Sequence, residues 1–259
     1  MFLQDFVTVM GDSSANSKRV MLQDGRFLAY REIGVPKEEA KYKIILVHGF
    51  GSSKSTSFSA SKDLIEELGV YFLLYDRSGY GESDSNTKHS LKSEVDDIAD
   101  LADQLSGVVF ISPTVNYQWP SLPEELIKKD YRRFLIKWTL VFYFNSHDME
   151  VLKRPTGFPM ATSSKDKLRD NIVYDTLRDD LAACFEQWDF EPADISITEE
   201  SFVHIWHGNK DLVIPVQLQR CILEKQPLIN YHEVPNGGHM IKDDSNICDA
   251  VLRALLHRG

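Results

Sequence analysis

The chain has 259 residues, of which 42% are hydrophobic and 26% charged, which suits a globular protein that buries a sizeable core. A formal net charge of −10 disfavours a polyanionic partner, so we expect no nucleic-acid binding. Three scattered cysteines (Cys184, Cys221 and Cys248) are odd in number and lack metal-binding spacing, which predicts buried thiols in a reducing compartment and no metal site.

The N-terminal residues predict neither a secretory signal nor a membrane anchor. Asp5 stands where a signal peptide would carry a basic region. The longest apolar run, Leu140–Phe144, is far too short to cross a bilayer. We therefore expect a cytoplasmic protein without a transmembrane segment, in which residues 1–18 form a flexible tail.

The first half of the chain alternates between predicted strands and helices. Asp24-Gly25, between two apolar-rich stretches, predicts a hairpin over residues 19–32. Continuous apolar runs predict strands buried on both faces, and apolar residues at helical spacing predict helices between them. The expected strands are 44–47, 70–75 and 107–111, and the expected helices are 62–68 and 91–105. This alternation is typical of a mostly parallel sheet flanked by helices, an α/β architecture.

The pattern changes after residue 112 and returns near residue 196. Residues 113–195 are rich in aromatic side chains at helical spacing and contain no strand pattern, so we interpret them as an inserted helical lid. Strands are predicted again at 202–206 and 230–234, with a helix after Pro215 and a last helix from Ser245. The predicted core is thus formed by residues 19–112 and 196–259.

Three predicted strands run directly into loops that carry candidate functional residues. Phe50 and Gly51 follow the first strand, and the Phe50 N–H could stabilise a developing oxyanion. Asp211 and His239 follow the last two strands, where a carboxylate could orient an imidazole. Each residue alone also fits ordinary turn chemistry. Because the carboxyl ends of parallel strands meet at one edge of a sheet, the three loops together predict one site.

Several short motifs resemble those of the α/β-hydrolases, specifically lid-bearing plant members. They are His48-Gly49-Phe50-Gly51, Asp76-Arg77-Ser78-Gly79-Tyr80-Gly81-Glu82-Ser83, Gly208-Asn209-Lys210-Asp211, Gly237-Gly238-His239 and the lid entry Asn116–Pro123. The resemblance implies the α/β-hydrolase fold with a helical lid and a site for a small apolar or ester-like molecule. It also implies that His239 acts as general base and then acid, and that Asp211 holds the tautomer of His239. The sequence has no metal-ligand spacing and no phosphate-binding loop, so we expect no metal and no organic cofactor.

The chain departs from this family at the nucleophile. The family carries a serine on a Gly-x-Ser-x-Gly turn between a central strand and a helix. No serine of this chain has glycine at both the −2 and +2 positions, and no such turn carries Asp or Cys. The elbow strand and following helix, roughly 30 residues or more, are expected to be missing as a block between Leu105 and Gly107.

This loss leaves two structural alternatives and three functional ones. The sheet keeps a gap, or strand 107–111 moves beside strand 70–75 and brings Ser112 near the site. Ser112 is a poor substitute nucleophile because Pro113 has no N–H to donate. Our main hypothesis is a hydrolase-family protein with impaired catalysis. The alternatives are a non-enzymatic, receptor-like protein that binds a small ligand, and an active carboxylic-ester hydrolase with an unrecognised nucleophile.

Overall fold

The computed structural model describes residues 18–102, 107–116, 119–127, 175–176, 179–180, 183, 188–191, 194–198 and 201–256. The predicted tail, apart from residue 18, and most of the predicted lid lie outside the described residues.

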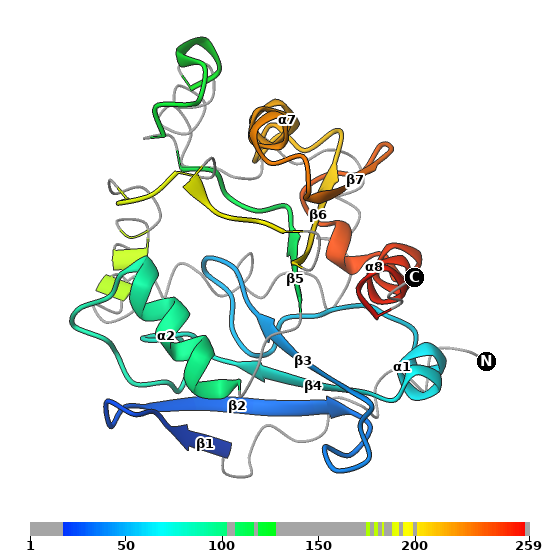
Figure 1. Ribbon diagram of the computed structural model, residues 1–259. Coiled ribbons are helices and arrows are strands. Elements are labelled where there is room, and N and C mark those ends of the chain that lie inside the picture. The colour runs from blue at the N-terminus through cyan, green and yellow to red at the C-terminus, as the bar shows by residue number, and fades with distance from the viewer. Residues whose placement is uncertain are drawn as a thin grey trace.

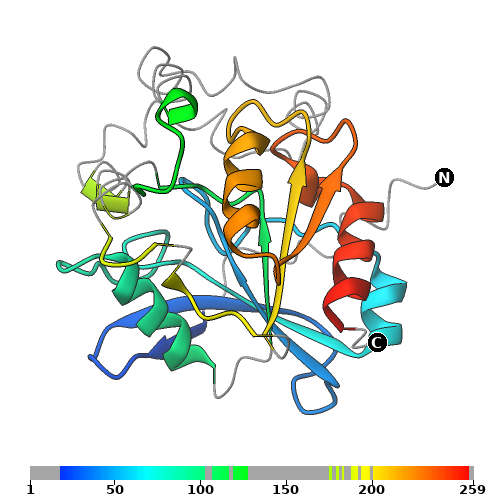
Figure 2. The same ribbon diagram turned by 45° about the horizontal axis from the view of Figure 1, so that its top comes forward.

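The described strands form two sheets (Figures 1 and 2). The first sheet has the order β1-β2-β4-β3, in which β3 and β4 are parallel and β2 is antiparallel to its two neighbours. The second has the order β5-β6-β7, with all strands parallel. The strands are β1 (Lys18–Met21), β2 (Phe27–Gly34), β3 (Tyr42–Val47), β4 (Val70–Tyr75), β5 (Gly107–Ile111), β6 (Phe202–Gly208) and β7 (Asn230–Val234).

Helices cover both faces of the first sheet, which gives the three-layer arrangement expected for an α/β protein. Side chains alternate along β4: Phe72 packs in one core cluster with α1 and α8, whereas Tyr75 packs in another with α2. In both views α1 and α8 lie side by side, away from α2 (Figures 1 and 2). The described helices are α1 (Lys62–Leu68), α2 (Leu91–Leu101), α7 (Val216–Lys225), α8 (Ser245–Leu256) and the short 3-10 helix η3 (Ile241–Asp243).

Helix α8 joins the two sheets. Its Leu252 packs with Val70 and Phe72 of the first sheet, while α8 also contacts β5 and β6 of the second. The Asp249 carboxylate accepts hydrogen bonds from the backbone N–H and the hydroxyl of Ser61, at 2.7 and 2.8 Å, and so ties α8 to the start of α1. Helix α8 therefore contacts both sheets, and its apolar face packs in the core of the first.

Two of the predicted strands differ from expectation. Within the described residues β3 pairs only with β4, and β5 pairs only with β6, although β3 and β5 lie next to each other in both views. The prediction that both are buried on both faces is wrong: Val47 on β3 and Phe110 on β5 are each 44% exposed. An edge strand lacks the neighbour that would cover it, which explains the exposure. The idea that β5 moves beside β4 is also wrong, because β4 lies between β2 and β3.

The predicted hairpin is confirmed, and local residue types also account for the ends of two helices. Gly25 has a φ of +88° in the β1–β2 turn, and Gly69 ends α1 in the left-handed conformation. The Ser90 side chain caps α2 and forms a reciprocal capping box with Ser93. Among the described helices, none is long and apolar enough to cross a membrane.

We predict that Leu252→Ala lowers the free energy of unfolding by about 2–5 kcal/mol, because it opens a cavity in the core between α8 and the first sheet. Urea denaturation followed by circular dichroism measures the change. Arg253→Ala, an exposed residue on the same helix, is the matched control and should shift it by less than about 0.5 kcal/mol. Equal effects of the two variants would show that α8 packing is not what holds the sheets together.

Candidate active site

Asp211 and His239, predicted from the sequence as an acid–base pair, lie together at the carboxyl end of the second sheet. His239 Nδ1 is 2.9 Å from Asp211 Oδ2, and Asp211 is 5% exposed. A carboxylate accepts only, so it holds the hydrogen on Nδ1 and leaves Nε2 as the basic nitrogen of the ring. This is the arrangement that a general base requires.

Glycine at position 208 allows the His239 loop to approach β6. A Cβ at Gly208 would lie 2.3 Å from the Gly238 carbonyl oxygen and 2.4 Å from that of Gly237, which is too close for any side chain. The Lys210 N–H donates to the Gly237 carbonyl at 2.9 Å and fixes the two loops against each other. The glycines of the two motifs therefore bring the acid and the base into contact.

Asp211 has further partners on its own loop. Its Oδ1 accepts from the backbone N–H groups of Val213 and Ile214 at 2.8 and 2.9 Å. His207 Nε2 lies 3.1 Å from Asp211 Oδ2 and 2.8 Å from the Ile214 carbonyl oxygen. Burial alone would raise the pKa of Asp211, but hydrogen bonds from His207 and His239 hold it well below its usual range. Sequence reasoning assigned no role to His207, although it stands in the motif that carries Asp211.

The turn after β3 holds the other predicted site residues. Gly51 has a φ of +67°, and its N–H donates to the Tyr80 hydroxyl at 3.4 Å. The Phe50 side chain is 38% exposed. None of the described residues accepts a hydrogen bond from the Phe50 N–H. The Phe50 amide is thus available to donate to a substrate oxygen, and its role as an oxyanion donor stays a prediction.

His48 holds this turn in place through two hydrogen bonds of its ring. Its Nε2 accepts from the Arg77 N–H at 3.0 Å, so Nδ1 carries the hydrogen and donates to the Gly49 carbonyl oxygen at 2.8 Å. Burial lowers the pKa of His48 to about 4. The residue is therefore a neutral structural member of the turn at physiological pH.

The loop after β4 is also tied to this rim. Asp76 is fully buried and accepts from the Lys54 N–H and ammonium at 2.6 and 2.7 Å and from the Glu82 N–H at 3.1 Å. A Cβ at Gly81 would lie 2.2 Å from the Asp76 carboxylate, so only glycine fits there. The contacts of Asp76 with Lys54 therefore connect the Asp-Arg-Ser-Gly-Tyr-Gly motif to the turn after β3, which is a structural role.

Ser112 ends β5 in a backbone conformation that serine rarely adopts, with a φ of +47°. Its N–H donates to the Trp206 carbonyl oxygen at 2.9 Å. Its buried Oγ makes no hydrogen bond with the described residues, His239 among them. Ser112 is thus beside β6 but not joined to the acid–base pair. Elsewhere in the described part of the chain, no three His, Cys, Asp or Glu side chains gather to hold a metal ion.

Comparison with known proteins supports the fold and nothing finer. No protein-family model and no curated protein matches the sequence. Among solved structures, the chain is similar to an esterase from Exiguobacterium antarcticum, with 16% identity, a TM-score of 0.62 and coverage of 93% of this chain and 100% of the other.

Two further solved structures are similar to this chain. A bromoperoxidase from Bacillus anthracis has 18% identity and a TM-score of 0.58, covering 93% of this chain and 100% of the other. An epoxide hydrolase of the alpha/beta hydrolase superfamily, from metagenomes of hot environments, has 14% identity and a TM-score of 0.53, covering 94% and 99%. The chain therefore has the α/β-hydrolase fold.

We predict that Asp211→Ala lowers the free energy of unfolding by about 1–3 kcal/mol at neutral pH, because it leaves buried N–H groups without an acceptor. The folded pKa of Asp211 lies below the ordinary 3.8, so its contribution is present above pH 3.8 and is lost as the pH falls through the folded pKa. The difference in the free energy of unfolding between the variant and the wild type should therefore be smaller at acid pH. Urea denaturation at neutral and acid pH measures it, with exposed Glu224→Ala as the control. A difference that does not change with pH would contradict the assignment.

We predict that His48 does not titrate between about pH 8 and pH 5, because its folded pKa is about 4. A pKa lowered from 6.5 means that the neutral ring stabilises the fold above pH 6.5 and that this contribution is lost as the pH falls toward 4. Proton NMR of the imidazole, assigned with His48→Gln, measures the midpoint. The same signal in urea should titrate near 6.5. A midpoint above 6 in the folded protein would refute a buried neutral ring.

Proposed function

We propose that this chain is a relative of the serine ester hydrolases that keeps their acid–base pair but forms no acyl-enzyme. The observation that carries the proposal is the assembled Asp211–His239 pair in a chain without a Gly-x-Ser-x-Gly turn. The family places the nucleophile on a central strand. A missing central strand would leave two sheet edges without a partner between them, and the lack of pairing between β3 and β5 supports that interpretation.

The expected activity is low because two components of the reaction are absent together. Removal of a catalytic serine costs on the order of 10⁶ in turnover in a well-studied protease. The second oxyanion donor in the family is the N–H after that serine, and loss of one such donor costs a further factor of about 10²–10³. Phe50 N–H and His239 could still polarise a carbonyl group and activate water, so slow general-base hydrolysis is the most that the site supports.

The ligand that we propose for this rim is a small apolar or ester-like molecule. Phe50 and Leu212 present exposed apolar side chains beside the candidate donor and beside Asp211, respectively. No cofactor is needed for the proposed chemistry. We further propose a reducing compartment such as the cytoplasm. This is supported by the free Cys221 and by Cys248, whose buried thiol has a pKa raised to about 12.

One observation favours a second candidate, an active esterase that uses Ser112. A serine on a strained turn at the carboxyl end of a parallel strand is how this fold presents its nucleophile, and Ser112 has a φ of +47°. Against it stand the buried Oγ, which is not bonded to His239, and Pro113, which has no N–H for the oxyanion. We therefore rank it below the impaired hydrolase.

A fluorophosphonate probe separates the two candidates, because it labels only activated serines. We expect no labelling of the wild-type protein, whereas an active serine esterase run in parallel is labelled stoichiometrically. Mass spectrometry of the intact chain measures the adduct. Labelling that disappears in Ser112→Ala, together with ester turnover that disappears in His239→Ala, would refute the proposal and establish the esterase.

A further inference from the structure

A buried polar cluster connects the loop after β4 to Asp180, which lies in a described part of the segment between β5 and β6. Arg77 donates two hydrogen bonds to the Asp180 carboxylate, Nη1 to Oδ2 at 3.0 Å and Nη2 to Oδ1 at 2.5 Å. The Tyr80 hydroxyl donates to Oδ2 at 2.6 Å. Asp180 is 1% exposed. A bidentate, buried pair of this kind fixes geometry more strictly than a surface ion pair does.

The two residues that bind Asp180 also bind the turn after β3. The Arg77 N–H donates to His48 Nε2, and the Tyr80 hydroxyl accepts from the Gly51 N–H. The Tyr80 ring also contacts the His48 ring edge-on, with centroids 4.9 Å apart. Two short paths of hydrogen bonds therefore lead from Asp180 to the turn that contains Phe50.

His89 determines the charge balance of this cluster. Arg77 Nε also donates to Glu94 Oε2 at 2.9 Å, so one guanidinium faces two carboxylates. His89 lies between the same two carboxylates, with Nδ1 3.5 Å from Glu94 and Nε2 3.6 Å from Asp180. The cluster is neutral when His89 is protonated and has one excess negative charge when it is not. The Asp180 carboxylate accordingly raises the pKa of His89.

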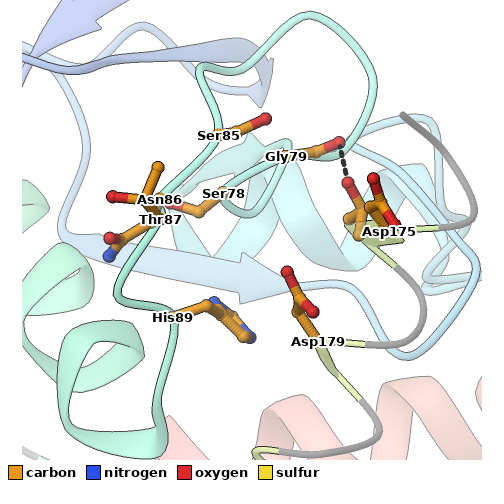
Figure 3. A pocket seen from close by; sticks show the side chains of 9 residues that line it. Ser78, Gly79, Ser85, Asn86, Thr87, His89, Asp175 and Asp179 are labelled. Carbon is orange, nitrogen blue, oxygen red and sulfur yellow. Dashed lines mark hydrogen bonds between the residues drawn. The ribbon is translucent and has the colours of Figure 1, made fainter. Parts of the chain in front are cut away.

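A pocket of about 240 Å³ lies beside the cluster (Figure 3). His89 lines it together with Asp175 and Asp179, two further carboxylates of the segment that carries Asp180. Thr176 Oγ1 donates to the Gly79 carbonyl oxygen at 3.0 Å and provides a second attachment of that segment. The groups that face His89 are thus Arg77 and Glu94 from the core and these acidic residues from the segment.

We infer that Asp180 is a positioning residue whose carboxylate fixes the His48–Gly51 turn through Arg77 and Tyr80. The Arg77–Asp180 pair and the geometry of the Phe50 amide are then coupled. Protonated His89 stabilises that pair, since it balances the charge that Arg77 alone cannot. A purely structural ion pair would hold the segment without affecting the turn, and this difference can be measured whether or not the protein has hydrolase activity.

Hydrogen exchange measured by mass spectrometry on the full chain tests the coupling. Asp180→Asn should speed exchange about 2- to 10-fold in the peptide that contains residues 46–53 as well as in its own, the change expected for loss of about one hydrogen bond. Tyr80→Phe, which removes only the hydroxyl, should speed exchange in the 46–53 peptide. Asp96→Asn removes a carboxylate from the exposed Lys92–Asp96 pair and should change neither peptide.

The pH dependence tests the role of His89. The folded pKa of His89 is raised above 6.5. Its contribution to the stability of the folded cluster is therefore complete below pH 6.5 and is lost as the pH rises through the folded pKa. After correction for intrinsic exchange rates, protection of the 46–53 peptide in the wild type should fall between about pH 6 and pH 9. His89→Gln should remove that fall.

Two results would overturn the inference. One is exchange that rises only in the peptide of the Asp180 segment in Asp180→Asn, which would make the pair purely structural. The other is a pH profile of the 46–53 peptide that is the same in His89→Gln and the wild type. If the Asp180→Asn variant no longer melts cooperatively, the test rests on Tyr80→Phe alone. Unchanged hydrogen exchange in the 46–53 peptide of that variant would then refute the coupling.

Discussion

The packing of α8 across two sheets is the contact on which the geometry of the site depends. A hydrogen-bonded ladder sets the distance and register of neighbouring strands, but β3 and β5 share none within the described residues. Side chains of α8 instead hold the two sheets together. Leu252 lies in the core of the first sheet, and Leu255 lies beside Gly107 of the second. The Phe50 turn belongs to the first sheet and the Asp211–His239 pair to the second. The two halves of the candidate site are therefore positioned relative to each other by apolar packing, by the polar contacts between α8 and α1, and by hydrogen bonds that join Ser57 and Ser59 after β3 to η3.

Buried carboxylates hold the loops of the rim, and each has specific partners. Asp76 accepts from Lys54 and a backbone N–H, Asp180 binds Arg77 and Tyr80, and Asp211 binds two imidazoles and two backbone N–H groups. An unpartnered buried charge would cost several kcal/mol, so each of these acids makes its loop adopt one conformation. The catalytic residues of an α/β-hydrolase lie on such loops, and loops need this support because they lack ladder hydrogen bonds. That the acids are satisfied on both sheets indicates that each half of the rim is structurally complete in itself.

The sequence predicted what short-range physics determines and missed what depends on neighbours. The Gly25 turn was readable because a tight hairpin needs that residue type locally. The Asp211–His239 contact was readable because both residues follow adjacent parallel strands. The exposure of β3 and β5 could not be predicted from the sequence. Apolar composition shows that a strand could be buried, but it does not show which elements lie beside that strand. Arg77, Tyr80 and Asp180 were missed for a related reason: their contacts span about a hundred positions of the chain, and the motif that holds Arg77 and Tyr80 reads as a loop.

Local contacts also explain how an acid–base pair can form in a chain without a Gly-x-Ser-x-Gly turn. The contacts that hold the pair all lie within β6, β7 and the loops after them: Gly208 admits the His239 loop, and backbone N–H groups of the loop that carries Asp211 bind its carboxylate. None of these contacts requires a strand between β3 and β5. A nucleophile elbow would need the central position of the sheet and neighbours on both sides. The proposed loss of a central strand would remove the elbow and one oxyanion donor while leaving the imidazole and its carboxylate in place, so a well-formed Asp–His pair is not by itself evidence of a working triad.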